Sequence, residues 1–184
     1  DTDSLLVAYN PTHGFLADMI ESGWDSSIGR ALPDAGSGNA RQIAAMFQQF
    51  SDDGRAMNTA ANSQGGLLTY TALRMLDEGT LAAVNTVNDQ GDKIKTEYMF
   101  QLNGSPVNTD DFIKAIEHTR SSTGNHPSGG HNINLGDPVA LILGGNAENT
   151  TEFLEALRQI PNLFDSDKSP HSNYFCQGDF CPNK

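Results

Sequence analysis

The stretch Met57-Asn58-Thr59-Ala60-Ala61-Asn62-Ser63-Gln64-Gly65-Gly66-Leu67-Leu68 decides the fold of this chain. A short lead-in of small and polar residues precedes the serine, two glycines follow it, and apolar residues at helical spacing begin at Leu67. This order predicts a strand over residues 55–61, a sharp turn at Ser63 and a helix over residues 64–77.

The small residues around Ser63 have a steric reason. A serine at the top of a sharp strand-to-helix turn has strained backbone angles, which bring the residues two before and two after it close together. Ala61 and Gly65 occupy those positions. The helix beginning at Gln64 would point its first amides toward the serine, where negative charge can be stabilised. Ser63 is therefore a candidate nucleophile and the Gln64 amide a candidate oxyanion donor, although an ordinary turn would also explain the pattern.

The stretch Ala61-Asn62-Ser63-Gln64-Gly65-Gly66 resembles the nucleophile elbow of the serine lipases and esterases of the α/β-hydrolase superfamily. That elbow commonly reads Gly-His-Ser-Gln-Gly-Gly or an Ala-first variant. Here Asn62 replaces the frequent histidine, which is not a triad member. The resemblance covers roughly residues 5–175 and implies one compact α/β-hydrolase-like domain over residues 1–184, with a mainly parallel sheet flanked by helices.

Two later turns extend the resemblance. Gly136-Asp137-Pro138-Val139 is similar to the turn that holds the triad acid in these families, and His171-Ser172, with aromatic residues shortly after, is similar to their late histidine loop. Gly104-Ser105-Pro106 matches a turn that often ends the strand after the elbow helix. The resemblance implies a triad of Ser63, Asp137 and His171, in the chain order of this fold. Taken alone, Asp137 reads as a turn former and His171 as a surface histidine.

The resemblance implies a second oxyanion amide in the loop after an early strand. Leu5-Leu6-Val7-Ala8-Tyr9 is typical of a strand, and Asn10-Pro11-Thr12-His13-Gly14 is a turn by composition. Because Pro11 has no N–H, Thr12 is the expected donor. His13, in the same turn, is interpreted as a loop residue outside the triad.

Residues 120–132 are expected to form a loop, because serine, glycine, asparagine and histidine dominate there. His126 and His131 lie five apart without a cysteine or carboxylate between them, so no metal site is predicted. The loop is interpreted as a surface crossing or a flap near the site. An alternative gives His131 the role of catalytic base, although it precedes Asp137 in the chain.

Apolar periodicity outlines the other elements. Asn39 is expected to cap one helix and either Asn149 or Thr150 another, and a further helix is expected to begin at Asn108 with acidic residues in its first turn. Residues 15–23 also have helical spacing, residues 94–102 partly alternate as a strand does, and residues 81–87 receive no assignment. The apolar residues Ile43, Met46, Phe47 and Phe50 form a stripe that predicts a helix packed on a sheet.

Length and charge limit the function. The 184 residues suit a single domain, and the formal net charge of −12 excludes a phosphate-binding surface for nucleic acid, which needs clustered lysine and arginine. The same charge disfavours docking on an anionic bilayer and would suit a basic partner, although plain solubility also explains it. No apolar run is long enough to span a membrane.

Cys176 and Cys181 permit either a local disulfide or a reduced pair, and two thiolates alone make a poor zinc site. A disulfide would fit an extracytoplasmic protein. The chain begins at Asp1 without an initiator methionine or a signal-like segment. We therefore expect a mature product or a fragment of a larger protein, secreted or delivered to a target cell.

The implied chemistry is acyl transfer without a metal or organic cofactor. The expected substrate is a carboxylic ester, with lipids among the candidates, cleaved through an acyl-enzyme. The acidity, the compact size and a loose resemblance to lipase-like effector domains suggest a toxin module with a basic immunity protein as partner. Two alternatives remain open: a non-catalytic α/β binding module, and an amidase or peptidase with the same triad.

Overall fold

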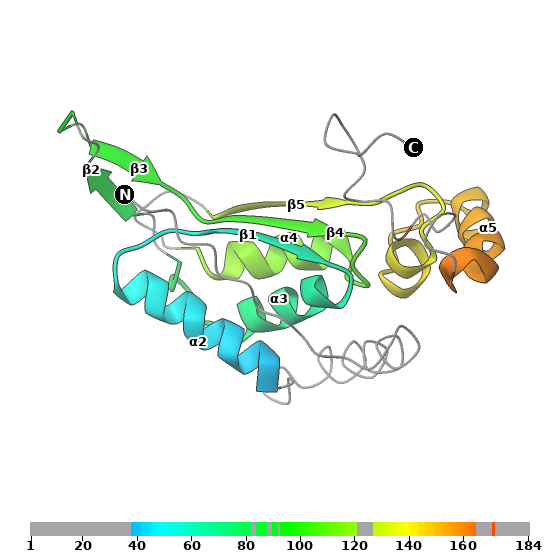
Figure 1. Ribbon diagram of the computed structural model, residues 1–184, viewed down its shortest axis with the longest axis horizontal. Helices are drawn as coiled ribbons and strands as arrows, with labels where there is room; N and C mark the ends of the chain where they lie inside the picture. Colours follow the sequence, from blue (N-terminus) through cyan, green and yellow to red (C-terminus); the bar gives the residue numbers. More distant parts are fainter. Residues whose placement is uncertain are drawn as a thin grey trace.

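A computed structural model of the protein describes residues 38–81, 84–87, 90–91, 93–120, 127–164 and 171. A parallel sheet of three strands, in the order β1-β4-β5, lies at its centre (Figure 1). The strands are β1 (Asn58–Asn62), β4 (Met99–Asn103) and β5 (Ser128–Asn132). Their last residues lie opposite one another, so the three carboxyl ends are level. The α/β class and the parallel sheet expected from the sequence are confirmed.

Three helices cover one face of this sheet (Figure 1): α2 (Gly38–Asp52), α3 (Gln64–Arg74) and α4 (Thr109–His118). The Phe47 ring of α2 meets the Phe100 ring of β4 edge to face, with centroids 5.4 Å apart. Burial of such rings supplies most of the free energy that holds a helix layer on a sheet. The largest fully buried apolar side chains are Phe47, Leu73, Leu81, Tyr98, Phe100, Leu102, Val107 and Phe112.

The expectation of a loop over residues 120–132 is wrong for its last part, because Ser128–Asn132 is strand β5. Gly129 allows helix α4 to pack closely against this strand. A Cβ atom at Gly129 would lie 2.3 Å from Ile116 Cδ1 and 2.9 Å from the Phe100 carbonyl oxygen. Gly129, one of the residues that suggest a loop in the sequence, is thus required by the packing of a helix on a strand.

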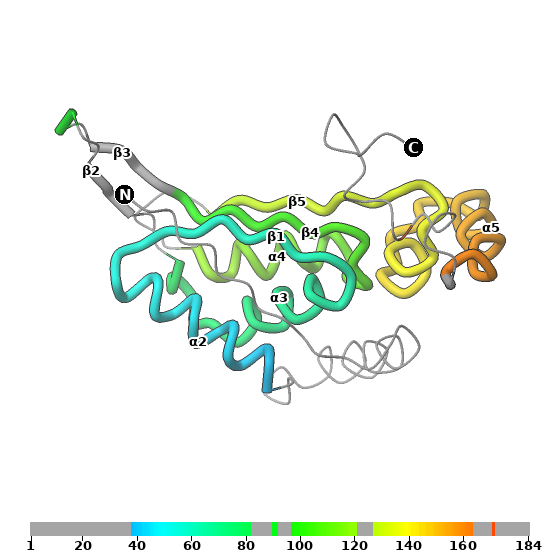
Figure 2. The backbone as a smooth tube through the Cα atoms, in the orientation of Figure 1, coloured from blue at the N-terminus to red at the C-terminus, as the bar shows by residue number. Residues whose placement is uncertain are grey.

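A pair of antiparallel strands precedes the second strand of the sheet in the chain. Strands β2 (Val84–Val87) and β3 (Lys93–Thr96) pair antiparallel, and the chain continues from β3 into β4 (Figures 1 and 2). The single strand predicted over residues 94–102 is therefore two strands with different partners. The change occurs at Glu97 and Tyr98, where the buried Tyr98 side chain donates its hydroxyl hydrogen to the Arg55 carbonyl at 2.6 Å.

The helix expected to begin at Asn108 is confirmed, and of the two residues considered as the cap of the last helix the structure has Asn149. Asn108 accepts hydrogen bonds from two amides of the first turn of α4, and Asn149 accepts one from the Glu152 amide of α5 (Thr150–Gln159). The prediction for Asn39 is wrong, because α2 begins one residue earlier and Asn39 lies inside it. A π-helical turn η2 (Val139–Leu143) and a 3₁₀ turn η3 (Ile160–Phe164) accompany α5 beyond the carboxyl ends of the strands (Figure 2).

Several expectations concern residues outside the described ranges: the strand over residues 5–9, the helix over residues 15–23, Thr12, His13, His126 and the pair Cys176 and Cys181. Among the residues that the structure describes, no helix has the length and apolarity needed to cross a membrane.

Candidate active site

Ser63 occupies the sharp turn between β1 and α3. Its backbone angles, φ 49° and ψ −123°, give it the only positive φ among the described residues other than glycine. Such a conformation costs about 1–3 kcal/mol and persists only where the surrounding structure imposes it. The Ser63 amide continues the sheet by donating to the Asn103 carbonyl at 2.9 Å, and its carbonyl accepts from the Ser105 hydroxyl at 2.6 Å. The serine is therefore held at the carboxyl edge of the sheet by contacts on both sides.

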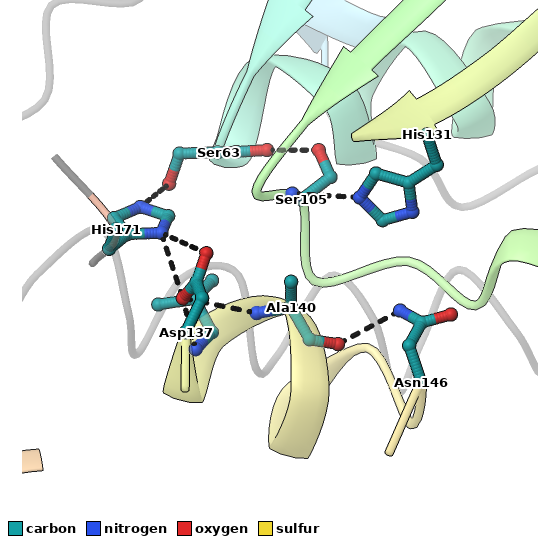
Figure 3. Close-up of polar contacts among 8 residues, drawn as sticks. Ser63, Ser105, His131, Asp137, Ala140, Asn146 and His171 are labelled. Atoms are coloured by element: carbon teal, nitrogen blue, oxygen red, sulfur yellow. Dashed lines mark hydrogen bonds and ion pairs between the residues drawn. The ribbon is translucent and has the colours of Figure 1, made fainter. Parts of the chain in front are cut away.

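The Ser63 hydroxyl, His171 and Asp137 form a continuous hydrogen-bonded chain (Figure 3). Ser63 Oγ lies 2.9 Å from His171 Nε2, and His171 Nδ1 lies 3.2 and 3.1 Å from the two carboxylate oxygens of Asp137. The structure thus brings together the three residues that the sequence named for a triad. They come from positions 63, 137 and 171 of the chain.

Asp137 is fully buried. A buried carboxylate requires hydrogen-bond donors, and Asp137 Oδ1 accepts from the amides of Val139 at 2.8 Å and Ala140 at 3.4 Å. Gly136, with φ 81°, turns the chain sharply just before it. Pro138 and the π-helical turn that follows direct these two amides back toward the carboxylate. The His171 ring also lies within hydrogen-bond distance of both oxygens of this carboxylate.

This arrangement has the requirements of nucleophilic catalysis by a serine. A carboxylate that accepts from Nδ1 keeps the proton of a neutral imidazole on that nitrogen, and leaves Nε2 free to accept the serine proton. The His171 side chain is 9 % exposed, so little water competes for these hydrogen bonds. The geometry is that of a nucleophile, a base and an orienting acid.

Of the two predicted oxyanion donors, only Gln64 lies in the described residues. It is the first residue of α3, immediately after Ser63, and is itself buried. Its amide therefore belongs to the N-terminal end of the helix, where the partial positive charge of the helix is located. The position of Thr12 lies outside the described ranges.

His131 does not reach the nucleophile. The Ser105 amide donates to its Nε2 at 3.2 Å, and its Nδ1 lies 3.1 Å from the Thr109 hydroxyl (Figure 3 shows the Ser105 contact). Burial lowers the pKa of His131 to about 4, against the opposing effect of the Asp137 charge, so its ring is neutral at pH 7. The alternative of His131 as catalytic base receives no support from this geometry. The described residues also contain no cluster of three or more His, Cys, Asp or Glu suited to a metal ion.

Sequence reasoning gave no role to Ser105 and did not single out Asn146, although both contact the turns that carry the triad. The Gly-Ser-Pro turn marked the position of Ser105, but its contact with Ser63 joins residues 42 apart. Asn146 lies in an apolar and glycine-rich neighbourhood without a motif, and no signal in the sequence would have identified it.

Comparison with known proteins gives no relative. No protein-family model matches the chain, and neither the curated proteins nor the solved structures contain a significant match.

Proposed function

We propose that this chain is a serine hydrolase of the α/β-hydrolase type that cleaves carboxylic esters, with lipids among the candidate substrates. The observation that supports the proposal is the chain of hydrogen bonds from Ser63 Oγ through His171 to Asp137, which begins at a serine with a positive φ. A strained nucleophile, a base and a buried acid in one contiguous chain are rarely combined for structural reasons alone.

In the proposed mechanism, His171 Nε2 takes the proton of Ser63 as the hydroxyl oxygen attacks the acyl carbon of the ester. Asp137 stabilises the imidazolium that forms, and the first amides of α3, including that of Gln64, face the developing oxyanion. His171 then gives the proton to the departing alkoxide, which leaves an acyl group on Ser63. A water molecule activated by His171 attacks this acyl-enzyme and releases the carboxylic acid.

The test is labelling by a fluorophosphonate probe together with hydrolysis of a short chromogenic ester. We expect the wild type to be labelled, and Ser63→Ala and His171→Ala to lose labelling. We expect the kcat of Asp137→Asn to be about 10³- to 10⁴-fold below that of the wild type, because the amide favours the wrong imidazole tautomer.

Matched control variants distinguish this outcome from a general effect of mutation. Ser128→Ala changes an exposed serine at the start of β5, and His118→Ala changes an exposed histidine at the end of α4. Both should keep the wild-type labelling rate. A folded wild type that neither reacts with the probe nor hydrolyses esters would contradict the proposal and favour the binding module.

A further inference from the structure

A second hydrogen-bonded path joins the serine turn to the aspartate turn without passing through His171, and Figure 3 shows its two ends, at Ser105 and at Ala140. It begins at the Ser63 carbonyl, which accepts from the Ser105 hydroxyl, and continues where the Ser105 amide donates to His131 Nε2. It ends at Ala140, whose carbonyl accepts from Asn146 Nδ2 at 2.8 Å and whose amide donates to Asp137 Oδ1 at 3.4 Å.

The donors and acceptors along this path fix the state of the His131 ring. An amide N–H can only donate, so His131 Nε2 must be the acceptor of the Ser105 hydrogen and carries no proton. The neutral ring then has its proton on Nδ1, from which it donates to Thr109 Oγ1 at 3.1 Å. The Thr109 hydroxyl in turn donates a hydrogen bond to Asn146 Oδ1 at 3.0 Å. Every hydrogen bond along these three residues therefore has one donor and one acceptor.

Asn146 is held more completely than any other member of the path. Its Oδ1 accepts from both the amide and the hydroxyl of Thr109, at 2.8 and 3.0 Å. Its Nδ2 donates to the carbonyls of Val107 and Ala140, both at 2.8 Å. All four hydrogen-bonding positions of the amide are used, which fixes its orientation. The side chain thereby ties the start of α4 to the turn that carries Asp137.

We propose that His131, Thr109 and Asn146 are positioning residues, whose hydrogen-bonded path holds the serine turn and the aspartate turn at the spacing that the triad needs. The proposal rests on the proposed function for its catalytic consequence. None of the three touches Ser63 Oγ, so they act through Ser105 and Ala140 on the residues that react. Loss of the path should reduce kcat and leave KM nearly unchanged, because it alters the geometry of the triad and not the contacts with substrate.

Thr109→Val is the decisive variant. It keeps the shape of the side chain, removes the hydroxyl between His131 and Asn146, and leaves the Thr109 amide bonded to Asn146. Thr119→Val is the matched control at the other end of α4, where a buried hydroxyl donates to the Ile116 carbonyl at 2.8 Å without contact to the path. Both variants lose one hydroxyl from the same helix.

We expect Thr109→Val to lower kcat for a chromogenic ester and the rate of fluorophosphonate labelling by about 10- to 100-fold, and Thr119→Val to retain the wild-type values. We expect His131→Phe to lose rate, because phenylalanine cannot accept the Ser105 hydrogen. His131→Gln places an amide oxygen near the position of Nε2 and should keep much of that rate. Equal rates in wild type and folded Thr109→Val, or equal losses in the two threonine variants, would overturn the proposal.

A second measurement does not depend on activity. Nuclear magnetic resonance of the His131 ring nitrogens should show a protonated Nδ1 and a bare Nε2, and the Ser105 and Ala140 amides should exchange hydrogen faster in Thr109→Val than in Thr119→Val. If the wild type were inactive, the proposed function would fail. The ring-nitrogen signals and the amide exchange rates would still test whether His131, Thr109 and Asn146 hold the two turns in place. Unchanged exchange at both amides, or a proton on Nε2, would overturn the claim.

Discussion

The two described histidines near the serine turn differ in what their ring nitrogens contact. His171 bridges a hydroxyl and a carboxylate, which are the partners of a base that must gain and lose a proton. His131 lies between an amide and a threonine hydroxyl, and burial lowers its pKa to about 4. A ring that cannot take a proton at neutral pH suits a fixed structural role. The hydrogen-bond partners, and not the residue type, therefore distinguish the two.

The low pKa of His131 makes the stability of the fold depend on pH. Its pKa lies below the ordinary value of 6.5, so the unfolded chain binds more protons between about pH 4 and pH 6.5, and the free energy of unfolding falls as the pH is lowered through this window. After allowance for solvent at a partly buried ring, we expect a loss of about 1–2 kcal/mol from this residue. Urea unfolding of wild type and His131→Gln across this window measures it. The variant should show a smaller loss, and identical pH profiles would contradict the prediction.

At the scale of elements, the turn after β1 and the turn after β4 are packed against each other through Gly66. A Cβ atom at Gly66 would lie 1.6 Å from Ser105 Oγ and 2.7 Å from Ser105 Cβ. Ser105 cannot move aside without losing its hydrogen bond to the Ser63 carbonyl. By contrast, a Cβ atom at Gly65 would lie 3.9 Å from Ala61 Cβ, an ordinary van der Waals distance. The close approach expected around the serine is present, but Gly66 carries the tighter constraint.

Gly66→Ala and Gly65→Ala should therefore have opposite effects on stability. We expect Gly66→Ala to cost about 1–3 kcal/mol by overpacking against Ser105. Gly65→Ala should be neutral or stabilise by up to about 1 kcal/mol, because alanine is the better helix former and the space is available. Chemical denaturation of the two variants beside the wild type tests this pair. Equal midpoints for both variants would show that the contact between the turns is looser than the structure indicates.

At the scale of the whole molecule, the parallel sheet determines where the functional residues meet. Parallel strands point their carboxyl ends to one edge, and in open α/β sheets this edge is where ligands bind. Ser63 follows β1, Ser105 follows β4 and Asp137 lies beyond β5, so all three lie at that edge. His171 reaches the same place from after α5. The toxin role, the immunity partner and the cellular location stay predictions.

The net charge of −12 is a property of the whole chain with a measurable consequence. Ion pairs such as Lys114 to Asp111, at 3.6 Å, and Arg158 to Glu155, at 3.4 Å, are exposed and contribute little. Added salt should therefore weaken the repulsion among the excess negative charges more than it weakens the attraction within ion pairs. We expect the Tm to rise by about 2–4 °C between about 10 and 150 mM salt. NaCl and KCl should act alike in thermal unfolding, and a Tm that falls with either salt would contradict the prediction.

Local patterns in the sequence determined the elements that depend on local physics. The serine turn was predictable because only small neighbours fit a strained strand-to-helix connection, and the cap at Asn149 was predictable because a cap bonds amides within one turn of itself. The apolar stripe that contains Phe47 predicted a helix packed on a sheet, which the structure confirms. The juxtaposition of Ser63, Asp137 and His171 was expected only through a family resemblance.

Tertiary structure alone decided the rest. Ser128–Asn132 reads as a loop in the sequence but is a strand, in which Gly129 leaves room for Ile116 of a helix that comes earlier in the chain. The path through His131 and Asn146 has no sequence motif, since the hydrogen bonds of His131 and Thr109 within it join residues 22 to 37 positions apart. A local pattern records only what a residue requires of its neighbours in the chain, whereas burial and the partners of a polar group depend on segments that folding brings together.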